Sequence, residues 1–329
     1  NIMKHFLVPT VVSIVLLTGV FIWLGPFAFL TAVLLTILEV TLSFDNAVVN
    51  ARVLENMSEV WRRRFLTWGM IIAVFGTRLV LPIIIVSASV WVDPWTVAKL
   101  AAFDPNAYSH LLESAKHAIY SFGAAFLIMV ALKYFFDESK EMHWIGAIEK
   151  HLSRWGRIEA IEIGLALITL VGFSYLVPDE QGVVLASGVI GIVLFIAMQG
   201  LASSFSEGVS KAGAAGLSLF LYLNVLDSAF SLDSVVGAFA LTTAIPVIVV
   251  GLGIGAYFVR SLTIYFVEKK TLDTLVYLEH GAHWAIFGLA VSMFAGLLLE
   301  VPEIITGGVG LAFVAAAYYS SLRLRARAT

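Results

Sequence analysis

The chain of 329 residues contains no cysteine and only a small share of charged residues. The absence of cysteine excludes disulfides, thiolate metal ligands and a cysteine nucleophile. Charged residues make up 13% of the sequence, against about 25% in soluble domains, whereas hydrophobic residues make up 60%. This composition predicts an integral membrane protein whose main partner is the lipid bilayer. Nucleic acid is not an expected partner.

Long apolar segments divide the chain into ten predicted membrane-spanning helices. A helix that crosses the hydrocarbon core needs about 20 apolar residues. Segments of about this length occupy residues 6–24, 27–50, 66–90, 113–136, 160–177, 183–203, 213–240, 244–267, 279–299 and 302–321. The first segment is interpreted as a retained span, because it lacks a small-residue cleavage site and continues through Gly25-Pro26 into the second. We therefore predict an all-α membrane protein.

Basic residues alternate from one loop to the next. The loops after the second, fourth, sixth and eighth segments, together with the C-terminal end, carry the loop arginines and nearly all the loop lysines, whereas the opposite loops carry only Lys99. Loops rich in arginine and lysine face the cytoplasm, so both termini are expected there. Residues 137–159 are predicted to form a cytoplasmic linker. It separates a first half of the bundle, residues 1–136, from a second half, residues 160–329.

One acidic motif occurs twice inside predicted spans. It consists of a carboxylate, a serine four residues later, an aspartate six residues later, and an amide or hydroxyl seven residues later. The two copies are Glu39, Ser43, Asp45 and Asn46 in the second segment, and Asp227, Ser231, Asp233 and Ser234 in the seventh. Because five segments separate the copies, the two halves cross the membrane in opposite directions. The sequence therefore predicts a five-plus-five inverted repeat, which is typical of secondary transporters with sites near the midplane.

The four carboxylates of this motif predict a cation site. Each ionised group at bilayer depth costs roughly 2.5–3.5 kcal/mol on insertion scales, so such residues are usually functional. Helical spacing places two polar stripes on single faces: Glu39, Ser43, Asn46 and Asn50, and Asn224, Asp227, Ser231 and Ser234. A spacing of six residues does not share a face, so we expect local unwinding near each Ser-x-Asp, which would free backbone carbonyls as ligands.

The opposite directions of the two copies also predict how their carboxylates lie. Glu39 and Asp227 are expected to meet near the midplane in a single shared site. Asp45 and Asp233 are expected to reach toward opposite surfaces.

Two further sets of polar residues recur at matching positions. Arg78 and Arg260 are interpreted as counter-ions, and a buried acid–arginine network that serves structure alone is left open. Two Glu-x3-His pairs, Glu113 with His117 and Glu279 with His283, place a carboxylate and an imidazole one helical turn apart. These pairs would act as extra metal ligands, gates or proton acceptors. Simple packing near a helix end is the alternative.

The donor types indicate which cation the site would take. Carboxylate and carbonyl oxygens without sulfur suit Mg²⁺, Ca²⁺ or Mn²⁺, and an added imidazole favours Mn²⁺ among these. No prosthetic group is expected. Proton coupling is expected, because carboxylates that release a metal can take up protons.

The acidic motifs, Arg78 and the segment Tyr277–Trp284 resemble those of the TerC-like integral membrane proteins of the LysE superfamily, in their uncharacterised bacterial branch. The resemblance covers most of residues 25–320. It implies a multi-pass protein of the bacterial inner membrane that transports a divalent cation, with manganese export as the leading expectation. The family's acidic site corresponds to Glu39, Asp45, Asn46, Asp227 and Asp233. Ser234 departs from the family pattern, which has asparagine there.

Three other functions are left open by the sequence. A membrane-embedded metal-dependent hydrolase would use the same acids, but the chain has no HExxH-type or serine–histidine arrangement, so no enzymatic activity is expected. A scaffold would recruit soluble partners through the 137–159 linker. An exporter of a small organic solute would be favoured by a cavity lined with cationic groups near the midplane. The sequence also leaves open whether the chain forms a homo-oligomer.

Overall fold

The computed structural model describes residues 2–140, 142–156, 158, 160–206 and 212–328. Helices account for 88% of it, and the described residues form no strand. The α-helices are α1 (Ile2–Leu42), α2 (Phe44–Glu55), α3 (Glu59–Ile71), α4 (Leu81–Val90), α5 (Pro94–Phe103), α6 (Pro105–Ser114), α7 (Lys116–Phe135), α8 (Gly146–Trp155), α9 (Ile161–Leu176), α10 (Gln181–Ser206), α11 (Ala212–Leu241), α12 (Ile245–Glu268), α13 (Thr271–Thr274), α14 (Leu278–Ala295) and α15 (Glu303–Ala328). A π-helix, η1 (Ile72–Val80), joins α3 to α4, and a short 3-10 helix, η2 (Pro178–Glu180), precedes α10.

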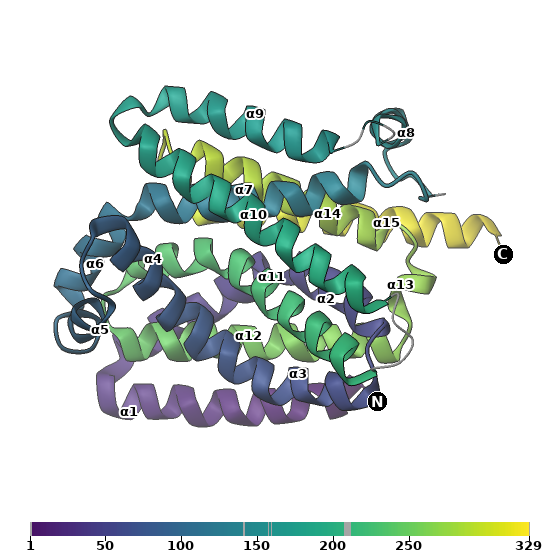
Figure 1. The fold of residues 1–329 in the computed structure, drawn as a ribbon. Helices are drawn as coiled ribbons and strands as arrows, with labels where there is room; N and C mark the ends of the chain where they lie inside the picture. The colour runs from purple at the N-terminus through teal and green to yellow at the C-terminus, as the bar shows by residue number, and fades with distance from the viewer. Residues whose placement is uncertain (1, 141, 157, 159, 207–211, 329) are drawn as a thin grey trace.

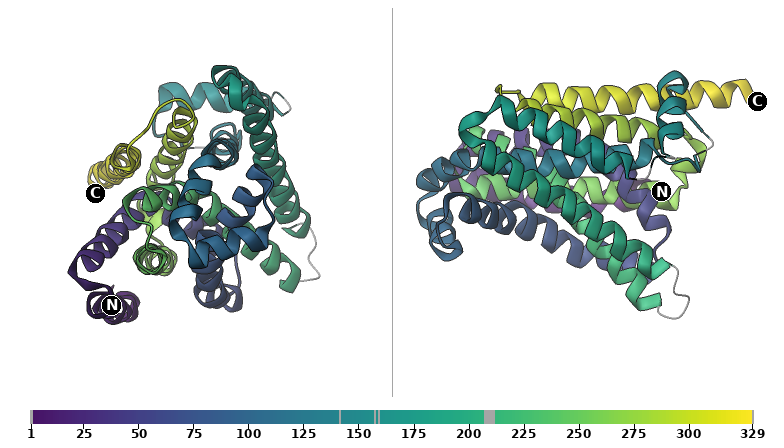
Figure 2. Two further views of the ribbon diagram at one scale, coloured as in Figure 1. Left: turned by 90° about the vertical axis from the view of Figure 1, so that its left-hand side faces the viewer. Right: turned by 45° about the horizontal axis from the view of Figure 1, so that its top comes forward.

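Most of the long helices run along one common direction, so that the connections gather at two ends of the molecule (Figure 1). One end, called the terminal end below, holds both termini, α8 and α13, and the other end holds α5 and α6 (Figures 1 and 2). The basic connections between α2 and α3 and between α12 and α14 lie at the terminal end. Lys99 of α5 lies at the opposite end.

The long helix α1 consists of two arms that meet at Gly25. Gly25 has φ 86° and ψ 178°, a backbone conformation that favours glycine, and the chain reverses its direction there (Figure 1). The ring of Phe6 in the first arm lies 6.4 Å from the ring of Tyr265, and the ring of Phe44, just beyond the second arm, lies 6.0 Å from the ring of Phe266. The two arms therefore start and end at the same level of α12, as in a helical hairpin.

Seven of the described helical segments are long and apolar enough to cross a membrane. They are Phe6–Leu42, Glu59–Val90, Lys116–Phe135, Pro178–Gly200, Gly216–Val236, Ile245–Glu268 and Ile305–Ala326. Ile161–Leu176 is apolar but shorter. The chain is thus an all-helical protein with the segments of a multi-pass membrane protein. The count of ten spans and the inverted repeat stay predictions.

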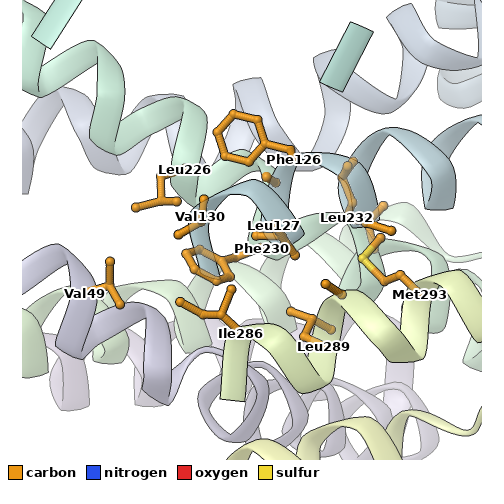
Figure 3. Close-up of a cluster of buried hydrophobic side chains, with 14 of the residues drawn as sticks. Val49, Phe126, Leu127, Val130, Leu226, Phe230, Leu232, Ile286, Leu289 and Met293 are labelled. Carbon is orange, nitrogen blue, oxygen red and sulfur yellow. The ribbon is translucent and has the colours of Figure 1, made fainter. Parts of the chain in front are cut away.

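The helices that carry the acidic motif pack on a shared apolar core around α7 (Figure 3). This core brings together side chains of α2, α7, α11 and α14, among them Val49, Phe126, Leu127, Val130, Leu226, Phe230, Leu232, Ile286, Leu289 and Met293. Small residues allow close approach, since a Cβ at Gly123 of α7 would lie 2.5 Å from Cε of Met293. α7 is buried on nearly all sides and packs directly on α11, whereas α2 packs mainly on α12 and α14.

Candidate functional site

The polar stripes of the two motifs face each other across the α2–α11 interface. The amide Nδ2 of Asn46 donates a hydrogen bond of 2.8 Å to Oδ1 of Asp227. The two helices run antiparallel (Figure 1), and Val49 and Val53 of α2 share cavity walls with Tyr222 and Leu219 of α11, respectively. Residue numbers therefore rise along α2 as they fall along α11. This register places Asn46 level with Asp227, and Glu39 level with Ser234.

Asp227 is held by partners from both halves of the chain. Its Oδ2 lies 3.3 Å from Nη2 of Arg260, and Nη1 of Arg260 donates a 3.0 Å hydrogen bond to the carbonyl of Phe65. The guanidinium also lies 4.1 Å from the centre of the Phe65 ring. Since Asn46 occupies Oδ1, both carboxylate oxygens of Asp227 have a partner. We call Asp227, Asn46 and Arg260 the Asp227 half-site.

Glu39 has the equivalent arginine but a less complete set of partners. Its Oε1 accepts hydrogen bonds from Nη2 of Arg78 and, at 3.1 Å, from the hydroxyl of Ser43. Nη1 of Arg78 donates to the carbonyl of Ala73 at 2.6 Å. Glu39 is 1% exposed, and its Oε2 has no hydrogen-bond partner among the described residues. We call Glu39, Ser43 and Arg78, with Ser231 and Ser234 at the same level of α11, the Glu39 half-site.

Arg78 belongs to the π-helix η1. Helices of this type are rare in proteins, and many of those that occur lie at functional sites. Its neighbour Thr77 contacts the hydroxyl of Ser228 on α11 at 2.8 Å. The two sequence-predicted counter-ions therefore each lie against the acid of their own half: Arg78 against Glu39 and Arg260 against Asp227.

The register differs from the single shared site that the sequence predicts. Asn46, not Glu39, contacts Asp227. Glu39 lies seven residues earlier on the same stripe, which is about 10 Å along a helix at about 1.5 Å per residue. The expectation that Glu39 and Asp227 meet is therefore wrong. The structure has two half-sites, related as the two motif copies are.

The remaining two acids are also buried. Asp45 is 4% exposed and Asp233 is 8% exposed. Oδ1 of Asp45 accepts a 2.9 Å hydrogen bond from the backbone N–H of Asn46, in the first turn of α2. A carboxylate is stabilised at this end of a helix by the helix dipole.

The predicted unwinding near Ser-x-Asp is absent from the second motif and slight in the first. α11 continues without a break through Ser231 and Asp233. α1 and α2 are separated only by Ser43, whose φ of −102° and ψ of 13° interrupt the helix for one residue. The backbone N–H of Ser43 still donates to the carbonyl of Glu39 at 2.9 Å. The motifs therefore offer side-chain oxygens rather than freed backbone carbonyls.

Several buried side-chain oxygens on the two polar stripes have no hydrogen-bond partner in the part of the chain that the structure describes. They are Glu39 Oε2, Asn46 Oδ1, Asn50 Oδ1, Asn224 Oδ1 and Ser231 Oγ. Leaving a polar group buried and unpaired costs about 1–3 kcal/mol, so such a set indicates a place for a bound cation or water. Among the described residues, no three acidic or histidine side chains approach closely enough to hold a metal ion. A cation here would need amide and hydroxyl oxygens as well as carboxylates.

Only the second of the two Glu-x3-His pairs has the predicted spacing of one helical turn, since Glu279 and His283 both lie on α14. In the first pair, Glu113 lies in the last turn of α6 and faces Lys116 at 3.7 Å, while His117 lies on α7, because the helix is interrupted at Ala115. In the second pair, Nδ1 of His283 donates to the backbone carbonyl of Glu279 at 2.8 Å. Neither pair therefore brings an imidazole onto its carboxylate.

The groups of the second pair have other partners near the terminal end. The carboxylate of Glu279 lies 3.0 Å from Nε of Arg52. The ring of His283 stacks on Tyr134 with 3.6 Å between the ring centres.

Sequence reasoning missed a buried carboxylate in the linker. Glu149 of α8 is 0% exposed and accepts hydrogen bonds from Nδ1 of His280 at 2.8 Å and Nε1 of Trp284 at 3.0 Å. Lys140 lies 3.4 Å away. Burial opposes ionisation of Glu149, but the hydrogen bonds from His280 and Trp284 and the charges on His280 and Lys140 outweigh it, and lower the pKa of Glu149 from 4.5 to about 2. Only the mixed charge of the linker hinted at this contact.

Two adjoining cavities open the terminal end toward the half-sites. They have volumes of about 570 Å³ and about 730 Å³ and share five lining residues: Lys133, Glu162, Phe195, Gln199 and Tyr222. The smaller one reaches Val49, three residues from Asn46. We call this joint space the vestibule. Its lining stops at Val49 on α2 and Tyr222 on α11, before the residues of the Asp227 half-site.

Comparison with known proteins places most of the chain in one family. Residues 44–328 match the family described as "Protein of unknown function (DUF475)". The chain matches no curated protein and no solved structure. The resemblance to the TerC-like proteins stays a prediction. Because the match extends from α2 to the end of α15, the chain belongs to the DUF475 family.

Proposed function

We propose that this protein is a secondary transporter of a divalent cation that works by alternating access and exchanges the cation for protons. The observation that carries the proposal is an excess of buried negative charge. The two half-sites and their flanking aspartates contain four buried carboxylates, Glu39, Asp45, Asp227 and Asp233, against two buried arginines. Two charges in excess correspond to one divalent cation or two protons. The same acids can therefore bind one divalent cation in one state and two protons in the other.

The donor atoms support a hard cation. The unpartnered oxygens belong to carboxylate, amide and hydroxyl groups, which suit Mn²⁺, Mg²⁺ and Ca²⁺. An imidazole ligand would favour Mn²⁺ over Mg²⁺ and Ca²⁺, but His283 lines the vestibule and belongs to neither half-site. The preference for Mn²⁺ export therefore rests on the resemblance to the TerC-like proteins. The vestibule is lined by two basic side chains, Lys133 and Arg52, against three acidic ones, Asp137, Glu138 and Glu162. This balance does not favour an anionic organic solute.

We further propose ten crossings, arranged as two inverted halves, in a bacterial inner membrane with both termini in the cytoplasm. The reversal at Gly25 supports two crossings by α1. The basic connections at the terminal end support the cytoplasmic assignment of that end. In this orientation the vestibule opens to the cytoplasm.

Metal flux into proteoliposomes tests the proposal. We expect Mn²⁺ uptake that a proton gradient drives, with Ca²⁺ and Mg²⁺ as competitors, and a loss of at least tenfold in Glu39→Gln and Asp233→Asn. Glu59→Gln is the matched control, because Glu59 is a surface carboxylate paired with Arg63. Flux at the wild-type rate in both core variants would contradict the site, and absence of metal flux in the wild type would contradict the function.

A further inference from the structure

The two half-sites differ in how the acid itself is paired across the two halves of the chain. In the Asp227 half-site, Nδ2 of Asn46 donates to Oδ1 of Asp227 at 2.8 Å. The counterpart of Asn46 in the other copy of the motif is Ser234, whose hydroxyl donates to the carbonyl of Ser231 in its own helix at 3.0 Å. Serine is too short to reproduce the amide's reach. As a result Asp227 is fully paired, while Oε2 of Glu39 is not.

The Asn46–Asp227 contact lies between the vestibule and two of the unpaired oxygens, Oε2 of Glu39 and Oγ of Ser231. The vestibule reaches Val49 and Tyr222, about one helical turn from this contact on the terminal side. In the antiparallel register, Glu39 precedes Asn46 and Ser231 follows Asp227, so both lie on the side of the contact away from the vestibule. A cation that follows the polar stripes from the vestibule to Glu39 must pass this contact.

We propose that the Asn46–Asp227 hydrogen bond is the vestibule-side gate of the transporter, and that Glu39 Oε2 and Ser231 Oγ are cation ligands behind it. This inference rests on the proposed function. The amide suits the task because its two ends differ: Nδ2 closes the gate on Asp227, while Oδ1 is buried without a donor and can face a passing cation. Both ligands behind the gate are 1% exposed, as a closed gate requires.

Thiol labelling tests the gate without any need for transport, and the cysteine-free chain supplies a clean background. Ser231→Cys is reconstituted in oriented vesicles and treated with a cationic methanethiosulfonate from the vestibule side. We expect Asn46→Ser to raise the labelling rate at least tenfold. Asn106→Ser is the control, because Asn106 is an exposed amide on α6, at the end opposite the vestibule, and it should leave the rate unchanged.

A second variant tests the ligands. Ser234→Asn places an amide opposite Glu39, where it should donate to Oε2 and compete with a cation. We expect the Mn²⁺ concentration that halves the labelling of Ser231→Cys to rise at least tenfold in this variant. Because Asn46 is intact there, this measurement also covers the case in which Asn46→Ser does not fold.

The outcomes separate the gate from the transport function. If Ser231→Cys is labelled at the same rate with and without Asn46→Ser, the gate is overturned. The gate is also overturned if the thiol of Ser231→Cys reacts as fast as the thiol of Ser139→Cys, which is exposed. Unchanged Mn²⁺ protection in Ser234→Asn overturns the ligand assignment. Gated labelling without any metal flux would instead overturn the proposed function and keep the gate.

Discussion

Each acid–arginine pair packs against a glycine that leaves room for it. A Cβ at Gly255 of α12 would lie 2.5 Å from Cβ of Glu39, and a Cβ at Gly69 of α3 would lie 2.6 Å from Nη1 of Arg260. At these two positions any larger side chain would displace the charged group or the helix that carries it. Glycine thus sets the position of both half-sites.

Gly255→Ala should destabilise the protein and lower cation flux. The added methyl group would overlap Glu39 and push α12 away from α1, and overpacking of this kind typically costs about 1–3 kcal/mol. Thermal unfolding in detergent and flux in proteoliposomes measure the two effects. Gly164→Ala is the matched control, because nothing lies within 4 Å of a Cβ at that position. Equal midpoints for both variants would contradict the packing argument.

The sequence predicts which residues form the half-sites but not how they pair. Helical periodicity places Glu39, Ser43 and Asn46 on one face, and the structure buries all three. Periodicity does not say which residues of two helices lie level with one another. The contact of Asn46 with Asp227, and the unpaired oxygen of Glu39 that follows from it, depend on that register.

At the level of elements, local capping signals account for helices that hydropathy alone merges or misses. Asp93 and Asp104 each precede a proline and accept hydrogen bonds from the backbone N–H of Thr96 and Ala107, at 2.9 Å and 3.1 Å. This pattern starts α5 and α6. The linker helix α8 is different, because its position depends on the burial of Glu149 against α14. No local signal in residues 137–159 identifies His280 and Trp284 as its partners.

The docking of α8 should weaken in acid. Because the pKa of Glu149 in the folded protein, about 2, lies below its ordinary value of 4.5, the ionised carboxylate stabilises the docked state. That contribution is complete above about pH 4.5 and is lost as the pH falls toward 2. We expect amide exchange in α8, corrected for its intrinsic rate, to be constant from pH 8 to 5.5 and to rise below pH 4.5.

Glu149→Gln should raise exchange in α8 about tenfold at neutral pH, since it removes the charge that His280 and Lys140 face. Exchange mass spectrometry measures this change. Asp179→Asn, at an exposed position of η2, is the control. A wild-type profile that is flat down to pH 2, or a glutamine variant with unchanged protection, would show that the carboxylate does not hold α8.

At the scale of the whole molecule, the exposed surface is that of a protein surrounded by lipid. Large apolar side chains such as Ile22, Phe27 and Ile168 point outward from the long helices. Trp91 and Trp95 are exposed near the end opposite the termini, where tryptophans of membrane proteins meet the lipid headgroups. Composition and segment length suffice to predict this class. The fold of α1 on itself at Gly25 decides how many times the chain crosses.

The number of crossings can be tested by the side on which the two termini lie. If α1 crosses once, the seven candidate helices are an odd number and the termini lie on opposite sides. If the arms on either side of Gly25 cross separately and the chain crosses ten times, both termini lie on the same side. We expect tags at both ends, and the thiol of Ser139→Cys in the linker, to react only from the cytoplasm. Ser109→Cys on α6 should react only from outside. A terminus that reacts from outside would contradict the hairpin, and it would remove the proposed inverted relation between the Glu39 and Asp227 half-sites, on which the proposed alternating access depends.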